Sequence, residues 1–203
     1  MYEITQQDYD TILFLTRLSY YSDVDDLYPE PFSKVATVET LSGLRFNVFE
    51  FDDYILVNIC GTNSLVDWIA NTKIALGITP KQIKQARNWV VNNVWTKTHK
   101  PLVLAGHSLG GAIASCVANL IGETCITFNS CGYKHLLDFN LIDEKLVLNV
   151  TTKHDILTGI TKRLPFKNYM QLYGRVITVD DKRFFLSVKS HSDFGAMTKV
   201  KID

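Results

Sequence analysis

The sequence predicts an α/β fold with a mostly parallel central sheet, an antiparallel N-terminal part and helices on both faces. Residues 124–129 and 146–151 are continuous apolar runs of strand length, the pattern of parallel strands covered on both faces. Helical patterns separate these strands from one another. Earlier in the chain, residues 34–60 contain three strand-like segments joined by short turns, which indicates an antiparallel start.

The length and composition are those of one soluble domain spanning residues 1–203. A chain of 203 residues buries about 70% of the surface that its unfolded form exposes. Lys plus Arg and Asp plus Glu both total 21, so the formal net charge is zero. This balance favours no nucleic acid partner. No apolar run approaches the length of a membrane span, so we expect no transmembrane segment.

The first element is expected to be a helix over about residues 6–21, packed against the sheet. Thr5 and Asp8 resemble a capping box, with Asp in place of the usual Glu or Gln. Apolar side chains then recur at helical spacing. Residues 22–32 contain two prolines and several acids, which predicts a loop.

Three strands follow in the antiparallel part of the sheet. They are expected at residues 34–39, 44–51 and 54–60, with turns at residues 42–43 and 52–53.

The next helix is expected to begin at Thr79, where a capping box coincides with Pro80 at the first helical position. It should end near Thr96. Its buried face is predicted to consist of Ile83, Ala86, Val90 and Val94.

The remaining elements alternate between strand and helix. A short buried strand at residues 102–105 precedes a helix of small residues that runs to about Ile121, with Gly122 as its C′ residue. After the two apolar strands, we expect a late hairpin and a terminal helix. The hairpin strands are placed at residues 175–179 and 184–188, and the helix at residues 191–200.

Residues 106–110 (Gly-His-Ser-Leu-Gly) match the G-x-S-x-G pattern between a buried strand and a helix. In this context the turn holds Ser108 so that its hydroxyl stands clear of the backbone as a nucleophile. The glycines let neighbouring elements come close, and the helix directs its positive dipole end at charge developing beside Ser108. The alternative is a tight turn whose serine caps the helix.

A nucleophilic serine needs a base and an acid that orients the base. In this kind of fold the order along the chain is serine, acid, histidine. Asp155 directly follows the predicted strand at residues 146–151, and His191 follows the last strand, so we expect these two to complete a triad with Ser108. His154 is the rival base.

The other histidines and acids are expected to have different roles. His107, inside the elbow, should help to shape the turn, and His99 and His135 should be surface or packing residues. Asp180 and Asp181 fall in the predicted hairpin turn and are expected to be solvated.

Acyl transfer also needs two N–H donors for the developing oxyanion. One is expected from Leu109, the residue after the nucleophile. The other is expected from the loop after an earlier strand, at Gly61 and Thr62.

Together these motifs resemble the class 3 lipase family, which has the α/β-hydrolase fold and hydrolyses acylglycerols and, in some members, phospholipids. The resemblance spans roughly residues 34–195. It implies Ser108 as nucleophile, Asp155 as acid, His191 as base, and the N–H groups of Thr62 and Leu109 as oxyanion donors. It rests on residues 60–68 (Cys-Gly-Thr-Asn-Ser-Leu-Val-Asp-Trp), 106–111 (Gly-His-Ser-Leu-Gly-Gly), 127–130 (Thr-Phe-Asn-Ser) and 154–156 (His-Asp-Ile) and on the late histidine.

Two departures from the family pattern affect this interpretation. Cys60 stands where the family usually has Arg, which removes a local ion pair or hydrogen bond. Only about ten residues separate Trp68 from Thr79, which argues against a large interfacial lid. Residues 74–78 remain a candidate for a short flap beside Ser108.

The sequence therefore predicts a serine carboxylic-ester hydrolase of the lipase or phospholipase A type, acting through a Ser-Asp-His triad and an acyl-enzyme. We expect no cofactor and no metal. The expected partner is a lipid or ester substrate at a membrane or micelle surface. Two alternatives stay open: a short-chain esterase without lipid specificity, and a catalytically degenerate hydrolase fold used for binding.

The expected compartment is the cytoplasm. The four cysteines lie in predicted buried elements without a metal-like C-x-x-C spacing, so we expect free buried thiols, which suit a reducing compartment. The first residues are polar and acidic rather than basic and then apolar, so no signal peptide is expected.

Overall fold

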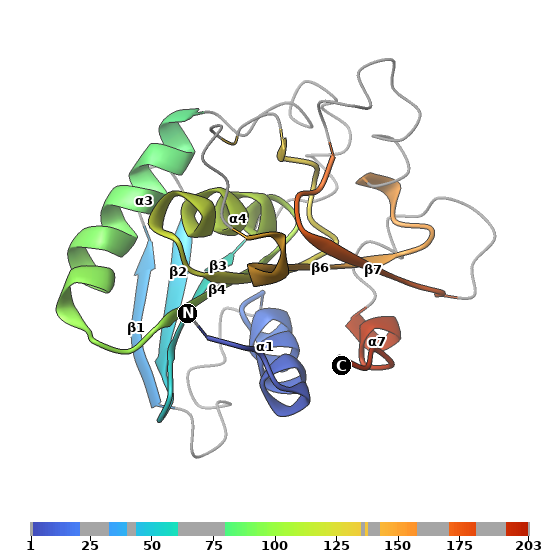
Figure 1. The fold of residues 1–203 in the computed structure, drawn as a ribbon, viewed down its shortest axis with the longest axis horizontal. Coiled ribbons are helices and arrows are strands. Elements are labelled where there is room, and N and C mark those ends of the chain that lie inside the picture. Colours follow the sequence, from blue (N-terminus) through green and yellow to red (C-terminus); the bar gives the residue numbers. More distant parts are fainter. Residues whose placement is uncertain are drawn as a thin grey trace.

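The computed structural model describes residues 2–20, 33–39, 44–60, 80–134, 137, 143–157, 171–181 and 194–202. Within these residues the chain forms a seven-stranded sheet whose spatial order follows the chain order, β1 to β7 (Figure 1). The strands are β1 (Ser33–Glu39), β2 (Arg45–Glu50), β3 (Ile55–Cys60), β4 (Leu102–His107), β5 (Thr124–Phe128), β6 (Val147–Thr152) and β7 (Arg175–Val179).

The sheet is mixed, as predicted. β1, β2 and β3 pair antiparallel, and β3 to β7 pair parallel in sequence. The turn at residues 52–53 is long enough to join two antiparallel strands, whereas each parallel pair needs a crossover connection. The carboxyl ends of β3 to β7 therefore meet at one edge of the sheet, which is called the carboxyl edge below.

Helices cover both faces of the sheet, which confirms the predicted fold class. Figure 1 shows α3 and α4 on one face and α1 and α7 on the other. Alternate residues of each strand face the two layers: Leu104 packs in the core beneath α3 and α4, and Ala105 packs in the core beneath α1 and α7. The helical elements are α1 (Gln6–Leu18), α3 (Pro80–Asn93), α4 (Leu109–Ile121), α7 (Phe194–Met197) and the short 3₁₀ turns η2 (Trp95–Lys97) and η4 (Glu144–Leu146).

The predicted capping box begins α1. The Thr5 hydroxyl accepts a hydrogen bond from the Asp8 N–H at 3.2 Å, and the Asp8 carboxylate accepts one from the Thr5 N–H at 2.9 Å. Asp therefore serves as well as Glu at this position. The helix ends at Leu18, earlier than predicted, because Ser19 closes it by donating its hydroxyl to the Thr16 carbonyl oxygen.

The sequence also located the buried face of α3 and the end of α4, whereas α3 ends earlier than predicted. The four side chains predicted to form the buried face of α3 are all buried. Gly122 ends α4 with φ 77°, the left-handed conformation expected of a C-terminal glycine. α3 stops at Asn93, and the short turn η2 follows it.

Three details at the C-terminal half differ from expectation or lie outside the described residues. β4 extends to His107, so Ser108 comes directly after the last strand residue. Residues 184–188, the second strand of the predicted hairpin, lie outside the described residues. The terminal helix α7 spans only Phe194–Met197 within the described part of the predicted range.

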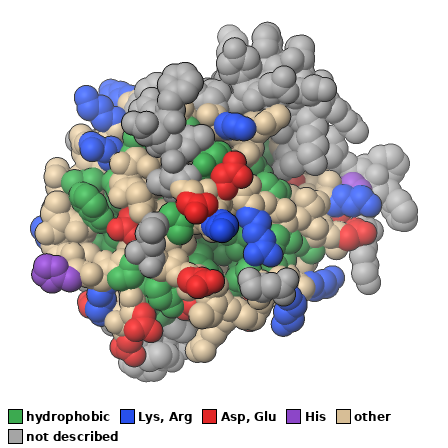
Figure 2. Space-filling view, viewed as in Figure 1, with side chains coloured by type: hydrophobic (Ala, Val, Ile, Leu, Met, Phe, Trp, Pro, Cys, Tyr) green, Lys and Arg blue, Asp and Glu red, His purple; other side chains and the backbone are tan. Residues whose placement is uncertain are grey.

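No helix in the described part of the chain combines the length and the hydropathy that a membrane crossing requires. All four cysteines are free and buried, as predicted. Figure 2 shows Lys and Arg side chains beside Asp and Glu side chains on one face of the molecule, in keeping with the balanced charge.

Candidate active site

Ser108 occupies a strained turn between β4 and α4. Its φ is 58° and its ψ is −127°, a backbone conformation that residues with a Cβ rarely adopt. Its N–H donates to the Phe128 carbonyl oxygen at 3.1 Å, and its own carbonyl oxygen accepts from the Ala112 N–H at 3.3 Å. Its side chain makes no capping hydrogen bond to α4. The hydroxyl is thus not used to cap the helix, which removes the alternative interpretation of this serine.

The glycines of the elbow are required by close backbone contacts. A Cβ on Gly106 would lie 2.6 Å from the Gly110 carbonyl carbon and 2.7 Å from the Ile59 carbonyl oxygen. A Cβ on Gly111 would lie 2.9 Å from the Gly106 carbonyl oxygen. The motif therefore lets α4 approach β3 and β4 closely, and these contacts hold the strained turn in place.

His107 supports the turn from the α1 side. Its ring is buried, and its Nδ1 lies 2.7 Å from the Tyr20 hydroxyl. The Phe194 ring packs against the same imidazole, with ring centroids 4.9 Å apart. The expected role of His107 in shaping the turn agrees with these contacts. Nothing in the sequence indicated this hydrogen bond, because Tyr20 and His107 are 87 positions apart in the chain.

Asp155 is fully buried and follows β6 at the carboxyl edge of the sheet. Its N–H donates to the Thr152 carbonyl oxygen at 3.1 Å. Cys131 contacts the turn at Ser108: its thiol donates to the Ser108 carbonyl oxygen, with 3.9 Å between Sγ and the oxygen. Burial raises the pKa of the Cys131 thiol to about 12, and the charge of the nearby Asp155 carboxylate adds to this shift.

Asn129 links the ends of β5 and β6, between the strands that lead to Ser108 and Asp155. It follows β5, has φ 43° and is fully buried. Its side-chain oxygen accepts hydrogen bonds from the N–H and the hydroxyl of Thr152, at 2.7 Å and 3.3 Å. Its place in the Thr-Phe-Asn-Ser stretch was the signal that could have identified it, although the residue itself was not singled out.

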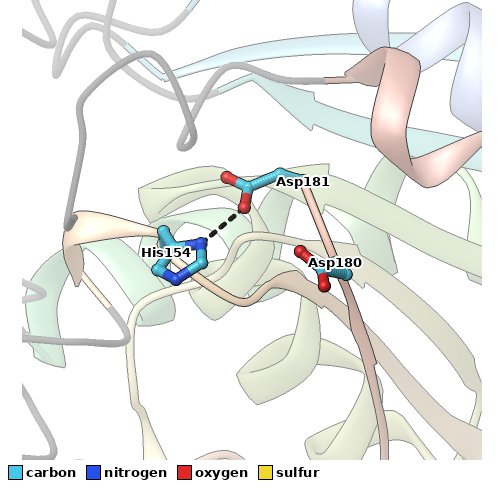
Figure 3. A group of neighbouring side chains, drawn as sticks. All are labelled: His154, Asp180 and Asp181. Carbon is cyan, nitrogen blue, oxygen red and sulfur yellow. Dashed lines mark hydrogen bonds and ion pairs between the residues drawn. The ribbon is translucent and has the colours of Figure 1, made fainter. Parts of the chain in front are cut away.

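His154 forms a histidine–carboxylate pair with Asp181, drawn in Figure 3 together with Asp180. The distance from His154 Nδ1 to Asp181 Oδ1 is 2.7 Å, and the Asp181 side chain is fully buried. The expectation of a solvated Asp181 is therefore wrong, because β7 carries it inward against the turn after β6. Asp180 is exposed, as expected.

These three residues could in principle hold a metal ion, since one ligand atom from each lies within 4.8 Å of the others. However, two ligand atoms of one tetrahedral zinc ion lie about 3.3 Å apart, given bonds of about 2.0–2.1 Å. The separation of 2.7 Å between His154 and Asp181 is that of a direct hydrogen bond. The two residues are therefore hydrogen-bonded to each other rather than arranged around an ion.

A surface hollow of about 620 Å³ lies at the opposite edge of the sheet. Its lining includes Thr124 and Arg175, the first residues of β5 and β7, and Tyr2 and Ile202 near the two ends of the chain. It is therefore separate from the elbow, which lies at the carboxyl edge.

The structure thus brings two of the expected catalytic residues, Ser108 and Asp155, to the same edge of the sheet, with one strand, β5, between theirs. Leu109 begins α4, so its N–H belongs to the first helical turn, whose donors lack acceptors within the helix. Thr62, His191 and the candidate flap at residues 74–78 lie outside the described residues, so their roles stay predictions.

Comparison with known proteins relates the chain to phospholipases. Residues 15–161 match a family model described as a Tle-like phospholipase domain. Over 91 residues the chain is 33% identical to an extracellular phospholipase A1 of Serratia liquefaciens, a match that covers 45% of this chain and 28% of that protein.

Among solved structures, the fold is shared with fungal lipases. Lipase II from Rhizopus niveus superposes with a TM-score of 0.60 at 16% identity, covering 89% of this chain and 82% of that one. The lipase from Rhizopus microsporus var. chinensis superposes with a TM-score of 0.61 at 14% identity, covering 95% and 83%. These matches confirm the predicted resemblance to the lipase fold.

The predicted compartment is also wrong. The protein was expected in the cytoplasm, but the relative from Serratia liquefaciens is an extracellular enzyme. The four cysteines are shielded by burial rather than by a reducing solvent, so their free state does not indicate the compartment.

Proposed function

Because the chain belongs to the Tle-like phospholipase domain family, we propose that it hydrolyses a carboxylic ester bond of glycerophospholipids. The family and the fold confirm the predicted enzyme class, a hydrolase of the lipase and phospholipase type. The observation that carries the proposal is the backbone of Ser108, held at φ 58° by contacts that only glycines at positions 106 and 111 permit. A turn without a catalytic role gains nothing from strain at a serine.

In the proposed reaction, Ser108 Oγ attacks the acyl carbonyl carbon while His191 takes the hydroxyl proton. The tetrahedral oxyanion is stabilised by the N–H groups of Leu109 and Thr62. His191 then gives the proton to the departing alcohol oxygen as the ester bond breaks, which leaves an acyl group on Ser108. Water, deprotonated by the same histidine, attacks this acyl-enzyme and releases the fatty acid. Asp155 orients the imidazole and stabilises its protonated form.

The position of Asp155 supports its role as the acid. Ser108 follows β4 and Asp155 follows β6, so only β5 separates them, which corresponds to about 10 Å between the strand axes. An imidazole can bridge a gap of that size. Its complete burial also keeps water from competing for its carboxylate oxygens, which suits a partner of a histidine.

The position of the described residues on either side of His191 supports it as the base. β7 ends next to β6 at the carboxyl edge, and Asp181 lies just beyond it. Phe194, three residues after His191, packs on the ring of His107, next to Ser108. Three residues of chain span at most about 11 Å, and this short link to Phe194 supports the proposal that His191 is the base.

The proposed substrate is taken from the relative in Serratia liquefaciens, which is a phospholipase A1. We propose hydrolysis of the acyl ester at a lipid surface outside the cell, where such a substrate is met as a bilayer or micelle. Neither the elbow nor the acid distinguishes a phospholipid from a triacylglycerol, since both react through the same carboxylic ester.

The test combines active-site labelling with product analysis. A fluorophosphonate probe should label the wild-type protein once, at Ser108, and should not label Ser108→Ala. Phospholipid vesicles should release fatty acid and lysophospholipid. A folded protein that is neither labelled nor active would instead be a binding module. Turnover of soluble p-nitrophenyl esters without turnover of vesicles would identify a short-chain esterase.

The triad itself is tested by comparing single and double variants. Ser108→Ala, His191→Ala and Asp155→Asn should each lower kcat greatly, and Ser108→Ala/His191→Ala should be little worse than either single variant, since a triad acts as a unit. Full activity of a folded His191→Ala variant would show that another residue is the base.

A further inference from the structure

The proposed mechanism leaves unused the best-defined histidine–carboxylate contact among the described residues, that between His154 and Asp181. Figure 3 shows the two side chains pointing toward each other from the turn after β6 and from the end of β7. The distance between Nδ1 and Oδ1 is 2.7 Å. The Asp181 side chain is fully buried and that of His154 is 16% exposed, so the contact is largely shielded from water.

The pair joins the two segments that carry the expected acid and base. His154 immediately precedes Asp155, and Asp181 precedes His191 by ten residues. The backbone ladder between β6 and β7 reaches Thr152 and Val179, and the Lys153 N–H adds one bond to the Val179 carbonyl oxygen at 2.8 Å. The side chains of His154 and Asp181 continue the connection where the ladder ends.

Burial makes this connection hard to exchange for water. A buried carboxylate is stable only where hydrogen-bond donors satisfy it. Removing one donor leaves the carboxylate buried without that hydrogen bond, which destabilises the fold. The His154 side chain therefore holds Asp181 in place, and Asp181 holds the turn that includes Asp155.

We propose that His154 and Asp181 are positioning residues of the ester hydrolysis: their contact holds the turn that carries Asp155 against the end of β7. This inference rests on the proposed function. A histidine whose Nδ1 faces a buried carboxylate also has the arrangement of a general base, so the experiment must separate positioning from base catalysis.

Three substitutions at His154 make this separation. In His154→Asn the amide nitrogen takes the place of Nδ1 and can donate to Asp181, but the side chain cannot accept a proton as a base. In His154→Gln, the matched control, the amide nitrogen lies one bond farther out, near the place of Nε2. His154→Ala removes the contact altogether.

We expect His154→Ala and His154→Gln to lower kcat on phospholipid vesicles by about 100-fold, as a misplacement of about 1 Å does, with KM little changed. His154→Asn should restore kcat to near the wild-type value. Rates are expressed per site titrated with the fluorophosphonate probe, so that loss of folded protein does not count as loss of catalysis.

The pH profile gives a readout that a purely structural role would not move. A nearby carboxylate raises the pKa of a histidine because it favours the charged form. If Asp155 sits farther from His191 in His154→Gln, the pKa of the base falls, and the acidic limb of kcat/KM moves to lower pH. In His154→Asn this limb should coincide with that of the wild type.

Two results would overturn the inference. A folded His154→Asn variant that is labelled poorly and is inactive would make His154 the base. His154→Gln with wild-type kcat and an unmoved acidic limb would show that the contact does not position the triad. Failure of the proposed function would look different, because the wild-type protein itself would then lack labelling at Ser108 or release of fatty acid.

Discussion

At the scale of single residues, Ser108 is defined by its backbone as much as by its hydroxyl. A φ of 58° with a ψ of −127° is open to glycine but strained for any residue with a Cβ. The strain is kept because the hydroxyl must stand clear of the turn between β4 and α4. Stability and catalysis therefore favour different residues at this position.

Ser108→Gly should accordingly be more stable than Ser108→Ala by about 1 kcal/mol, because only the glycine variant relieves the backbone strain. Both variants lack the hydroxyl, so their difference isolates the backbone, and urea unfolding measures it. Ala112→Gly, in the interior of α4, is the control and should lose about 1 kcal/mol. Equal stability of the two Ser108 variants would show that the turn is not strained.

Tyr20 is a second residue whose effect reaches the nucleophile. Tyr20→Phe removes the hydroxyl 2.7 Å from His107 Nδ1 and should lower the free energy of unfolding by about 1 kcal/mol. Because His107 precedes Ser108, the rate of fluorophosphonate labelling should fall as well. Tyr2→Phe breaks a comparable hydrogen bond to Asp8, at 3.0 Å, away from the elbow, and should leave labelling unchanged. Labelling of Tyr20→Phe at the wild-type rate would contradict this link.

At the scale of elements, the approach of α4 to β3 and β4 decides the shape of the elbow. The glycine at position 106 lies where backbone atoms of α4 and β3 come within 3 Å of a Cβ. Backbone atoms cannot move aside as a side chain end can. By contrast, Gly122 at the end of α4 has φ 77° and no atom within 4 Å of a Cβ.

Substitutions at these two glycines separate the effect of steric crowding from that of backbone conformation. Gly106→Ala should destabilise the fold by about 3 kcal/mol through overpacking and should also slow labelling of Ser108. Gly122→Ala should cost about 1 kcal/mol through left-handed strain alone and leave labelling intact. Thermal or urea unfolding measures the first quantity and the fluorophosphonate probe the second. Similar effects of the two substitutions on labelling would mean that the elbow tolerates a shift of α4.

At the scale of the whole molecule, two apolar layers enclose the sheet and exclude water from several titratable groups. Three cysteines pack in the layer beneath α3 and α4. Burial raises the pKa of Cys125 from 9.0 to about 12 and that of Cys131 likewise to about 12, and burial also raises the pKa of Cys116. The folded protein therefore keeps these thiols protonated at pH values where the unfolded chain loses their protons.

The free energy of unfolding should for this reason fall as the pH rises above 9. Below pH 9 both states hold the thiol protons and no difference arises; between pH 9 and about 12 only the folded state holds them, so stability declines. Each such thiol should account for about 1 kcal/mol at pH 10. Urea unfolding between pH 8 and pH 10 measures the decline, and Cys125→Ala should make it shallower. A flat profile in the wild type would show that the thiols are accessible to water.

Several features were predictable from the sequence because they depend on neighbouring residues. The capping box at Thr5 and the left-handed Gly122 are set by a few adjacent positions, and so is the strand–turn–helix around Ser108. The parallel part of the sheet was predictable from apolar runs in β5 and β6. The ends of elements were predicted less well. α1 stops at Leu18 because Ser19 closes it, and the spacing of apolar residues does not predict this hydrogen bond.

Contacts between side chains far apart in the chain were decided only by the tertiary structure. Tyr20 and His107 are 87 positions apart, and His154 and Asp181 are 27 positions apart across a parallel pair of strands. Such contacts depend on the register of the strands and on how a helix lies on the sheet. The sequence by itself determined the order of the elements and the strained serine, because local sterics and hydrogen bonds specify them. The register of β7 against β6 decided that Asp181 is buried against His154 rather than solvated in a turn.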